Sequence, residues 1–254
     1  MPIDFAYAQA RAQARQAGRL AAARWRSAES STDLNHYVHS LRGTALAPVV
    51  QHFTRASSPH AIERALRLSW RTDVERASEW VPAPWRNSVA WTTWLPDLDS
   101  IRFLLDGGAA LPWMLEDKVL GRFALDEKDA RRIAIEAHLG RLPPAAEFVP
   151  AEWWIGRWRE QLPTTALAGT GLDELVSLLR SFSSDGWGQE SPSATAYDSM
   201  ELLSAGIVRL LHRRAATPVS AYCHLALTAI ELMRLRGGLV QRTLANAGEF
   251  RRPA

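Results

Sequence analysis

The segment TPVSAYCHLALTAIELMRLR, residues 217–236, decides the fold of this chain. It opens with Thr217 and Pro218, a capping hydroxyl followed by a proline at the first helical position, where a missing N–H costs nothing. Polar side chains then recur at three- and four-residue spacing and share one narrow stripe: Ser220, His224, Thr228, Glu231 and Arg234. Most of the remaining circumference is apolar, so the segment predicts a long helix, from 217 to about 246, inside a packed helical body.

Three charged residues, Glu231, Arg234 and Arg236, stand among apolar residues near the end of this segment. Charged side chains in such surroundings need a polar partner. We expect them, together with Arg11 and Arg15 near the start of the chain, to contact a partner protein. Ion pairs between helices of the same chain explain these charges at least equally well.

The composition is that of a globular protein with a substantial core. The chain has 254 residues, of which 47% are hydrophobic and 22% charged, with a formal net charge of +3. Arginine outnumbers lysine by 28 to 2, which codon bias explains and which also suits ion pairs and partner surfaces. The one cysteine, Cys223, excludes an internal disulfide, and we interpret it as a small core residue. Neither a signal peptide nor a membrane span is predicted, so we expect a cytoplasmic protein.

Helix caps recur along the chain and no period-2 strand pattern does, so we predict an all-α fold. We expect a funnel-like array of two to three small helical units. Predicted helices include residues 3–28, which Gly18 weakens without ending, and the ranges 58–80, 171–182 and 195–214.

A linker is predicted at Pro143 and Pro144, which divides the chain into residues 1–142 and residues 143–254, the second part closed by the long helix. The polar, glycine-bearing stretch 183–193 predicts a loop. The segments WVPAPW at 80–85 and FVPAEW at 148–153 are alike, a weak indication of duplicated helical units.

The sequence carries little that points to chemistry. It has no glycine-rich phosphate motif, no nucleophile elbow and no zinc-binding helix motif. His36 and His39 have a spacing that can hold a metal, but surface histidines explain them better. Asp97 and Asp99 can be read as an acid–base pair, but each lies where a helix N-cap is expected. We therefore expect no enzyme, with no catalytic, metal-binding or cofactor-binding residue and no cofactor.

Four separated pieces, in order along the chain, resemble the helical rotor-socket component of V-type ATPases, which is designated C in prokaryotic complexes and d in eukaryotic ones. They are Tyr7 to Leu20, with Arg11 and Arg15; Leu41, Thr44 and Leu46; Ile62, Glu63 and Leu66 followed by Asp97, Ser100, Ile101 and Arg102; and Glu231, Arg234 and Arg236. Leu46 replaces an aromatic residue of the family pattern, and Ser100 and Arg234 each replace an asparagine. The chain is also shorter than full-size members, which suggests a reduced helical unit.

The resemblance implies a non-catalytic funnel that seats the central stalk and rests on the membrane proteolipid ring during proton or sodium transport. It implies a location at the inner face of the membrane through these partners, without a membrane span. The competing interpretation is a stand-alone helical scaffold or nucleic-acid-binding adaptor that keeps the fold without the ATPase. In that interpretation arginines would bind the nucleic acid. The candidates are Arg11, Arg15, Arg19, Arg131, Arg132, Arg213, Arg214, Arg251 and Arg252.

Overall fold

The computed structural model describes residues 4–54, 56–144, 147–163, 170–186 and 193–249. Within these ranges every regular element is helical, which confirms the all-α prediction. The α-helices are α1 (Ala6–Ala17), α2 (Ala22–Glu29), α3 (Leu34–Arg42), α4 (Ala47–Val50), α5 (Pro59–Trp80), α6 (Ala83–Ala90), α7 (Leu98–Leu105), α8 (Pro112–Glu116), α9 (Lys128–Leu139), α10 (Pro150–Glu160), α11 (Leu172–Gly186), α12 (Ser193–Arg213) and α13 (Val219–Glu249). Two short 3₁₀ helices are η1 (Trp91–Asp97) and η2 (Leu120–Arg122).

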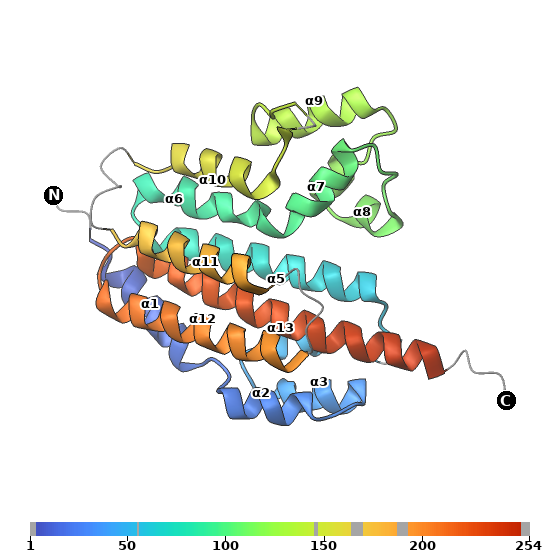
Figure 1. The fold of residues 1–254 in the computed structure, drawn as a ribbon, viewed down its shortest axis with the longest axis vertical. Helices are drawn as coiled ribbons and strands as arrows, with labels where there is room; N and C mark the ends of the chain where they lie inside the picture. The colour runs from blue at the N-terminus through green and yellow to red at the C-terminus, as the bar shows by residue number, and fades with distance from the viewer. Residues whose placement is uncertain (1–3, 55, 145–146, 164–169, 187–192, 250–254) are drawn as a thin grey trace.

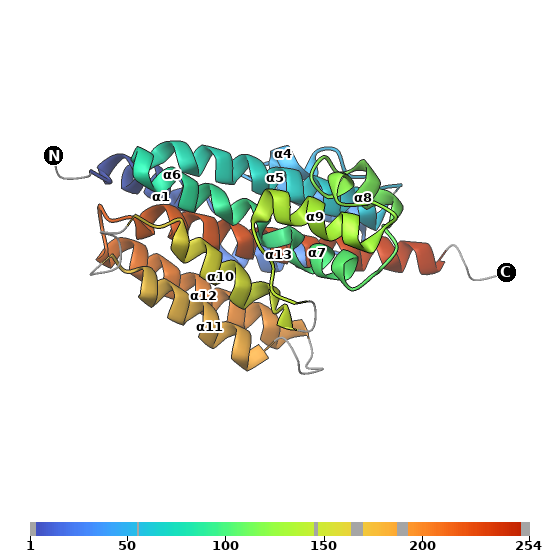
Figure 2. The ribbon, with the colours of Figure 1, turned by 90° about the horizontal axis from the view of Figure 1, so that it is seen from above.

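Helix α13 is the central element, as the opening segment predicts. It spans 31 residues and packs against α1, α3, α5, α11 and α12. Figure 1 shows it running through the middle of the molecule between α5 and α12. Seen from above, α1, α5 and α6 lie on one side of α13 and α10, α11 and α12 on the other (Figure 2). The broad apolar surface of α13 is therefore covered on several sides.

The apolar side chains form two separate cores. The larger core joins residues from α1 to α6 with residues from α10 to α13. The smaller core is built from α7, α8, η2 and α9, together with Leu142 and Phe148. The predicted linker at Pro143 lies between those last two residues; whether the parts on either side of it are separate domains stays a prediction.

Two helix starts show the capping bonds that their sequences call for. Asp33 accepts a hydrogen bond from the backbone N–H of His36 at 3.0 Å, and Ser58 accepts one from Ala61 at 3.2 Å. The helix predicted over 58–80 is α5. Prolines at its first positions, and at those of α6 and α10, cost no hydrogen bond there.

The two similar VPA segments each begin a helix, α6 and α10. The indole N–H of Trp91, just after α6, lies 3.4 Å from the carbonyl oxygen of Trp154, and that of Trp154 lies 3.3 Å from the carbonyl oxygen of Trp91. Figure 1 shows α6 and α10 side by side. The reciprocal bonds join the residue after α6 to α10.

Two predictions of local structure are wrong. The helix predicted over 3–28 is two helices, because α1 ends at Gly18 and the backbone of Ala21 is extended before α2 begins. The loop predicted over 183–193 is helical at 183–186, which belong to α11, and at 193, where α12 begins; residues 187–192 lie outside the described ranges.

Candidate functional site: the polar seam of α13

The polar stripe of α13 is buried and forms a seam with the N-terminal helices. Ser220 donates a hydrogen bond of 2.5 Å to the side chain of Gln9 on α1, and Gln9 donates one of 3.2 Å to the carbonyl of Leu211. Gln9 and Ser220 are both buried. The seam therefore begins with a hydrogen-bonded contact among α1, the end of α12 and the start of α13.

Arg19 provides the centre of the seam. It lies in the short connection between α1 and α2, where the break after Gly18 turns its side chain onto α13. Its Nη2 donates to the carbonyl of His224 at 3.0 Å and to the hydroxyl of Thr228 at 2.9 Å, and its Nη1 pairs with Glu231. One arginine thus joins three successive positions of the stripe. We call Arg19, His224, Thr228 and Glu231 the Arg19 cluster.

Burial dominates the electrostatics of the Arg19 cluster. Burial raises the pKa of Glu231 although Arg19 opposes this, and burial lowers the pKa of Arg19 although Glu231 opposes it. Burial, together with the positive charges of Arg19 and Arg15, lowers the pKa of His224 to about 3. His224 is therefore neutral at pH 7, and its ring lies 4.8 Å from that of Trp80.

A second arginine, Arg234, extends the seam one turn further. Its Nε and Nη2 donate to the two carboxylate oxygens of Glu29 at 2.6 and 2.8 Å, and its Nη1 lies 3.1 Å from Glu201 on α12. Its guanidinium also lies 5.0 Å from the ring centres of both Trp25 and Tyr197. Arg234 therefore ties α2 and α12 to the same turn of α13.

The five predicted partner residues divide into two groups. Arg234 is buried and Glu231 is largely covered, and both are held in the ion pairs just described, which is the intramolecular arrangement that the sequence left open. Arg11, Arg15 and Arg236 are exposed. Arg11 lies 5.6 Å from the ring centre of Trp80, and Arg236 pairs with Glu63. A partner contact at any of the five stays a prediction.

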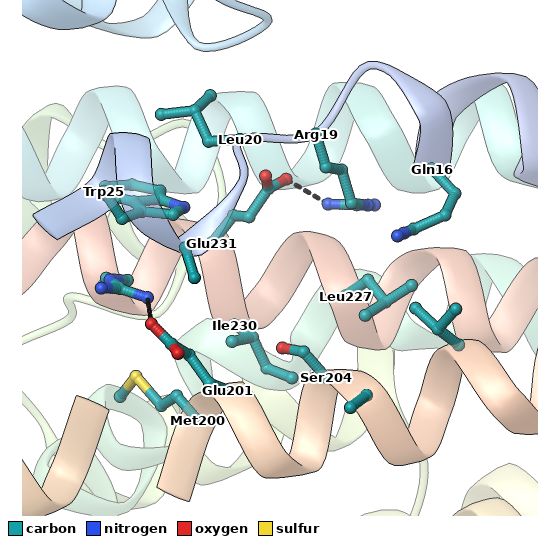
Figure 3. Close-up of a pocket in the computed structure, with 14 residues that line it drawn as sticks. Gln16, Arg19, Leu20, Trp25, Met200, Glu201, Ser204, Leu227, Ile230 and Glu231 are labelled. Atoms are coloured by element: carbon teal, nitrogen blue, oxygen red, sulfur yellow. Dashed lines mark hydrogen bonds and ion pairs between the residues drawn. The ribbon is translucent and has the colours of Figure 1, made fainter. Parts of the chain in front are cut away.

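Two hollows flank the Arg19 cluster. The first, of about 370 Å³, lies between α12, α13 and the connection from α1 to α2 (Figure 3). We call it the α12-side hollow; its lining is mainly apolar, including Leu20, Trp25, Met200, Leu227 and Ile230. Figure 3 shows the Arg19–Glu231 pair at its upper wall. The buried carbonyl oxygen of the Gln16 side chain, which belongs to this lining, has no hydrogen-bond partner among the described residues.

The second hollow, of about 360 Å³, lies between α1, α4, α5 and α13. We call it the α5-side hollow. Arg19 and Glu231 line both hollows, so this ion pair stands between them. A molecule that entered either hollow would therefore lie beside this salt bridge.

A separate polar cluster connects the two cores and was not foreseen from the sequence. Arg67 and Arg71 on α5 both pair with Asp97, and Arg71 also pairs with Asp117 at 2.9 Å. Burial alone would raise the pKa of Asp117, but hydrogen bonds from Arg71 and from the backbone of Leu120 and Val119 hold it below its usual value. Asp97 lies at the N-cap position of α7, as expected, but its side chain makes no capping hydrogen bond and pairs with the two arginines instead.

The cysteine at the centre of the molecule is a core residue, as expected. Cys223 is fully buried, and burial raises the pKa of its thiol to about 12. A thiol in this state is not a nucleophile at neutral pH. Tyr222 beside it donates a hydrogen bond of 2.7 Å to Ser88.

No protein-family model, curated protein or solved structure matches this chain. Among the described residues, no helix combines the length and the apolar character needed to cross a membrane. The polar seam and the two hollows beside it are the features of the molecule that bear on its function.

Proposed function

We propose that this chain is a non-catalytic helical coupling subunit, resembling the V-type ATPase rotor socket that links the central stalk to the membrane proteolipid ring. The four sequence pieces described above support this proposal, and so does an architecture made of packed helices. The observation that carries it is the cross-bracing of α13 by buried arginines.

A part that transmits torque has to resist bending and sliding between its helices. α13 is about 46 Å long at the usual rise of a helix. The Arg19 cluster fastens the connection between α1 and α2 to its middle, and Arg234 fastens α2 and α12 one turn further. Buried ion pairs add little net stability but fix one geometry, because breaking one leaves an unpaired buried charge. The seam therefore suits a mechanical role.

Partner contacts in this proposal fall on the exposed arginines beside α5. Arg11 lies at the Trp80 end of α5 and Arg236 at the Glu63 end. These ends are separated by about 25 Å along the helix. Arginine at a protein surface favours contact with acidic and aromatic partner groups.

The test is co-purification from the organism's own membranes. A tagged chain, extracted in mild detergent, is expected to bring down a stalk subunit and the proteolipid, identified by mass spectrometry. The double variant Arg11→Glu/Arg236→Glu is expected to recover about tenfold less of the stalk subunit, which corresponds to about 1.4 kcal/mol. The proposal is overturned if the tagged chain, isolated from the membrane fraction and from the soluble fraction, recovers neither the stalk subunit nor the proteolipid.

A matched control changes two exposed arginines on the helices that form the smaller core. Arg102→Glu/Arg122→Glu makes the same change of charge on α7 and η2, away from α5 and α13. This variant is expected to recover the stalk subunit as well as the unchanged chain does. An equal loss in both variants would mean that net charge alone, and not the α5 face, governs the contact.

Nucleic acid is the poorer candidate partner because several of its predicted arginines have partners within the chain, while Arg251 and Arg252 lie outside the described residues. Arg213 and Arg214 both pair with Glu174, and Arg132 pairs with Glu136 at 3.0 Å. Arg131 donates to backbone carbonyls, including that of Gly108 at 2.6 Å. Nuclease-sensitive co-purification with DNA or RNA would favour the adaptor alternative.

A further inference from the structure

We call the charged residues that line the α5-side hollow its charged wall and the apolar residues its apolar wall; the remaining lining residues are polar: His52, Ser69, Thr72, His224 and Thr228. The charged wall includes Arg15, Arg19, Arg76, Asp73 and Glu231. The apolar wall comes from α4, the turn before it, α5 and α13, through Ala45, Leu46, Pro48, Val49, Ala65, Leu68 and Leu232. Its volume, about 360 Å³, lies at the small end of the range for ligand pockets.

The charges of this lining do not cancel. Three arginines face two carboxylates, which leaves one positive charge when histidine is counted as neutral. Arg19 is paired with Glu231, and Arg76 lies 3.3 Å from Asp73. Arg15 makes no ion pair with any residue of the described ranges and is exposed at the hollow. The uncompensated charge is therefore that of Arg15.

The positions of these groups define what can fill the hollow. Asp73 is near Arg15 and Arg76, and burial raises its pKa while both arginines oppose the rise. A doubly charged anion would be attracted by the guanidinium of Arg15 but repelled by the carboxylates of Asp73 and Glu231. A cation would be repelled by Arg15. A ligand with a single negative charge and an apolar body matches both the charged wall and the apolar wall.

We propose that the α5-side hollow binds a small monocarboxylate with an apolar chain, on the order of eight carbons. The carboxylate pairs with Arg15 and is bordered by Arg76. The chain lies against Leu46, Val49 and Leu232. This site goes beyond the proposed coupling role and does not depend on it.

The first test is calorimetric titration of the isolated full chain at pH 7 with three eight-carbon probes. Octanoate is expected to bind with one saturable site and a Kd of about 0.1–1 mM. Octylamine and octyl phosphate are each expected to bind at least about tenfold more weakly. The proposal is overturned if octanoate shows no saturable binding at about 10 mM, or if octylamine or octyl phosphate binds equally well.

The second test locates the carboxylate. Arg15→Gln is expected to weaken octanoate binding at least about tenfold, and Arg15→Lys to restore part of it because the charge returns. Arg11→Gln, one turn earlier on the same exposed side of α1, is the matched control and is expected to bind octanoate unchanged. Equal affinity of Arg15→Gln and Arg11→Gln contradicts the assignment. Arg15 is exposed, so circular dichroism is expected to show an unchanged fold in all three variants.

These measurements are separate from the co-purification test. Neither Arg11 nor Arg236 lines the α5-side hollow, so the double variant that tests the partner contact leaves the ligand site intact. If the unchanged chain binds octanoate but recovers neither the stalk subunit nor the proteolipid, only the coupling role fails. If it recovers them but does not bind octanoate, only the ligand site fails.

Discussion

At the scale of single residues, the Arg19 cluster is a case in which removal from water outweighs attraction between charges. The pKa of Glu231 is raised and that of Arg19 is lowered, so the interior disfavours the charged form of both partners. The pair persists because Arg19 is also held by Thr228 and by the carbonyl of His224. Its geometry is fixed by these neutral acceptors as much as by the opposite charge.

His224 makes the stability of the protein depend on acidity. The unfolded chain takes up a proton on this imidazole near its ordinary pKa, whereas the folded protein does so only near pH 3. Between these values the unfolded state binds more protons, so the free energy of unfolding falls as pH falls, by up to about 1.4 kcal/mol per pH unit. Glu231, with its raised pKa, acts in the opposite direction, since its contribution is lost as pH rises.

We therefore predict that His224→Gln reduces the loss of stability on acidification. Urea unfolding measured from pH 7 to pH 4 is expected to show a smaller fall in the free energy of unfolding for the variant than for the unchanged protein. His36→Gln is the control, because the His36 side chain is 83% exposed. Parallel pH profiles for the unchanged protein and His224→Gln would contradict the prediction.

At the scale of helices, the contact between α3 and α13 depends on a missing side chain. A Cβ built on Gly238 would fall on the hydroxyl end of the buried ring of Tyr37. A Cβ on the neighbouring Gly237 meets only the hydroxyl of Tyr197, at 3.7 Å, an ordinary contact. Arg242, one turn further, covers the Tyr37 ring at 4.1 Å. Of these two adjacent glycines, only Gly238 is a close contact.

This difference gives a paired prediction on adjacent residues. Gly238→Ala is expected to destabilise the protein by about 1–3 kcal/mol, because the added methyl group forces α3 away from α13. Gly237→Ala is expected to be neutral or to stabilise by up to about 1 kcal/mol, since alanine is the better helix former. Thermal unfolding of both variants decides the matter. Equal effects in the two variants would show that helix propensity alone governs this turn.

Periodicity predicted the long helices better than it predicted their ends. The helix over 58–80 has both a cap and a regular apolar face, and both signals agree. Gly18 alone did not reveal the break before α2, because one glycine costs a helix only about 1 kcal/mol. The contacts of Arg19 with α13 favour the end of α1 at this point. They join residues more than 200 positions apart, so the local sequence does not reveal them.

At the scale of the whole molecule, two cores are joined through a charged contact. Arg67 and Arg71 leave the long helix α5 and meet Asp97 and Asp117, which belong to the segment that carries the smaller core. Asp97 is 1% exposed, and burial raises its pKa although both arginines oppose the rise. Loss of its charge therefore leaves the buried guanidinium group of Arg67 without its ion-pair partner, whereas Arg71 keeps Asp117.

We predict that Asp97→Asn destabilises the protein by about 3 kcal/mol. The neighbouring Asp99 is exposed in the first turn of α7, so Asp99→Asn is expected to cost no more than about 1 kcal/mol. Hydrogen exchange in Asp97→Asn is expected to rise more in α7 to α9 than in α13. Uniform acceleration along the chain would mean that the charged contact supports both cores alike.

The stripe on α13 was readable from the sequence, but its partners were not. Helical spacing placed Ser220 to Arg234 on one face, and burial confirmed that this face is internal. Nothing in the sequence selected Arg19 from the other arginines of the N-terminal segment as the one that turns inward. The two hollows depend on where α1, α4 and α12 come to rest, which is a property of the packed chain rather than of any one segment.

The seam also sets an order of events during synthesis. Its bonds to α1, α2 and their connection join groups 202 to 212 positions apart, and the ribosome makes α1 and α2 first. At usual rates of translation the early helices wait roughly 10–40 s before α13 is made. Until then Trp25 and the apolar sides of α1 and α3 have no central helix to cover them. The nascent chain is therefore a natural client for a chaperone that holds such surfaces until translation has supplied the last helix.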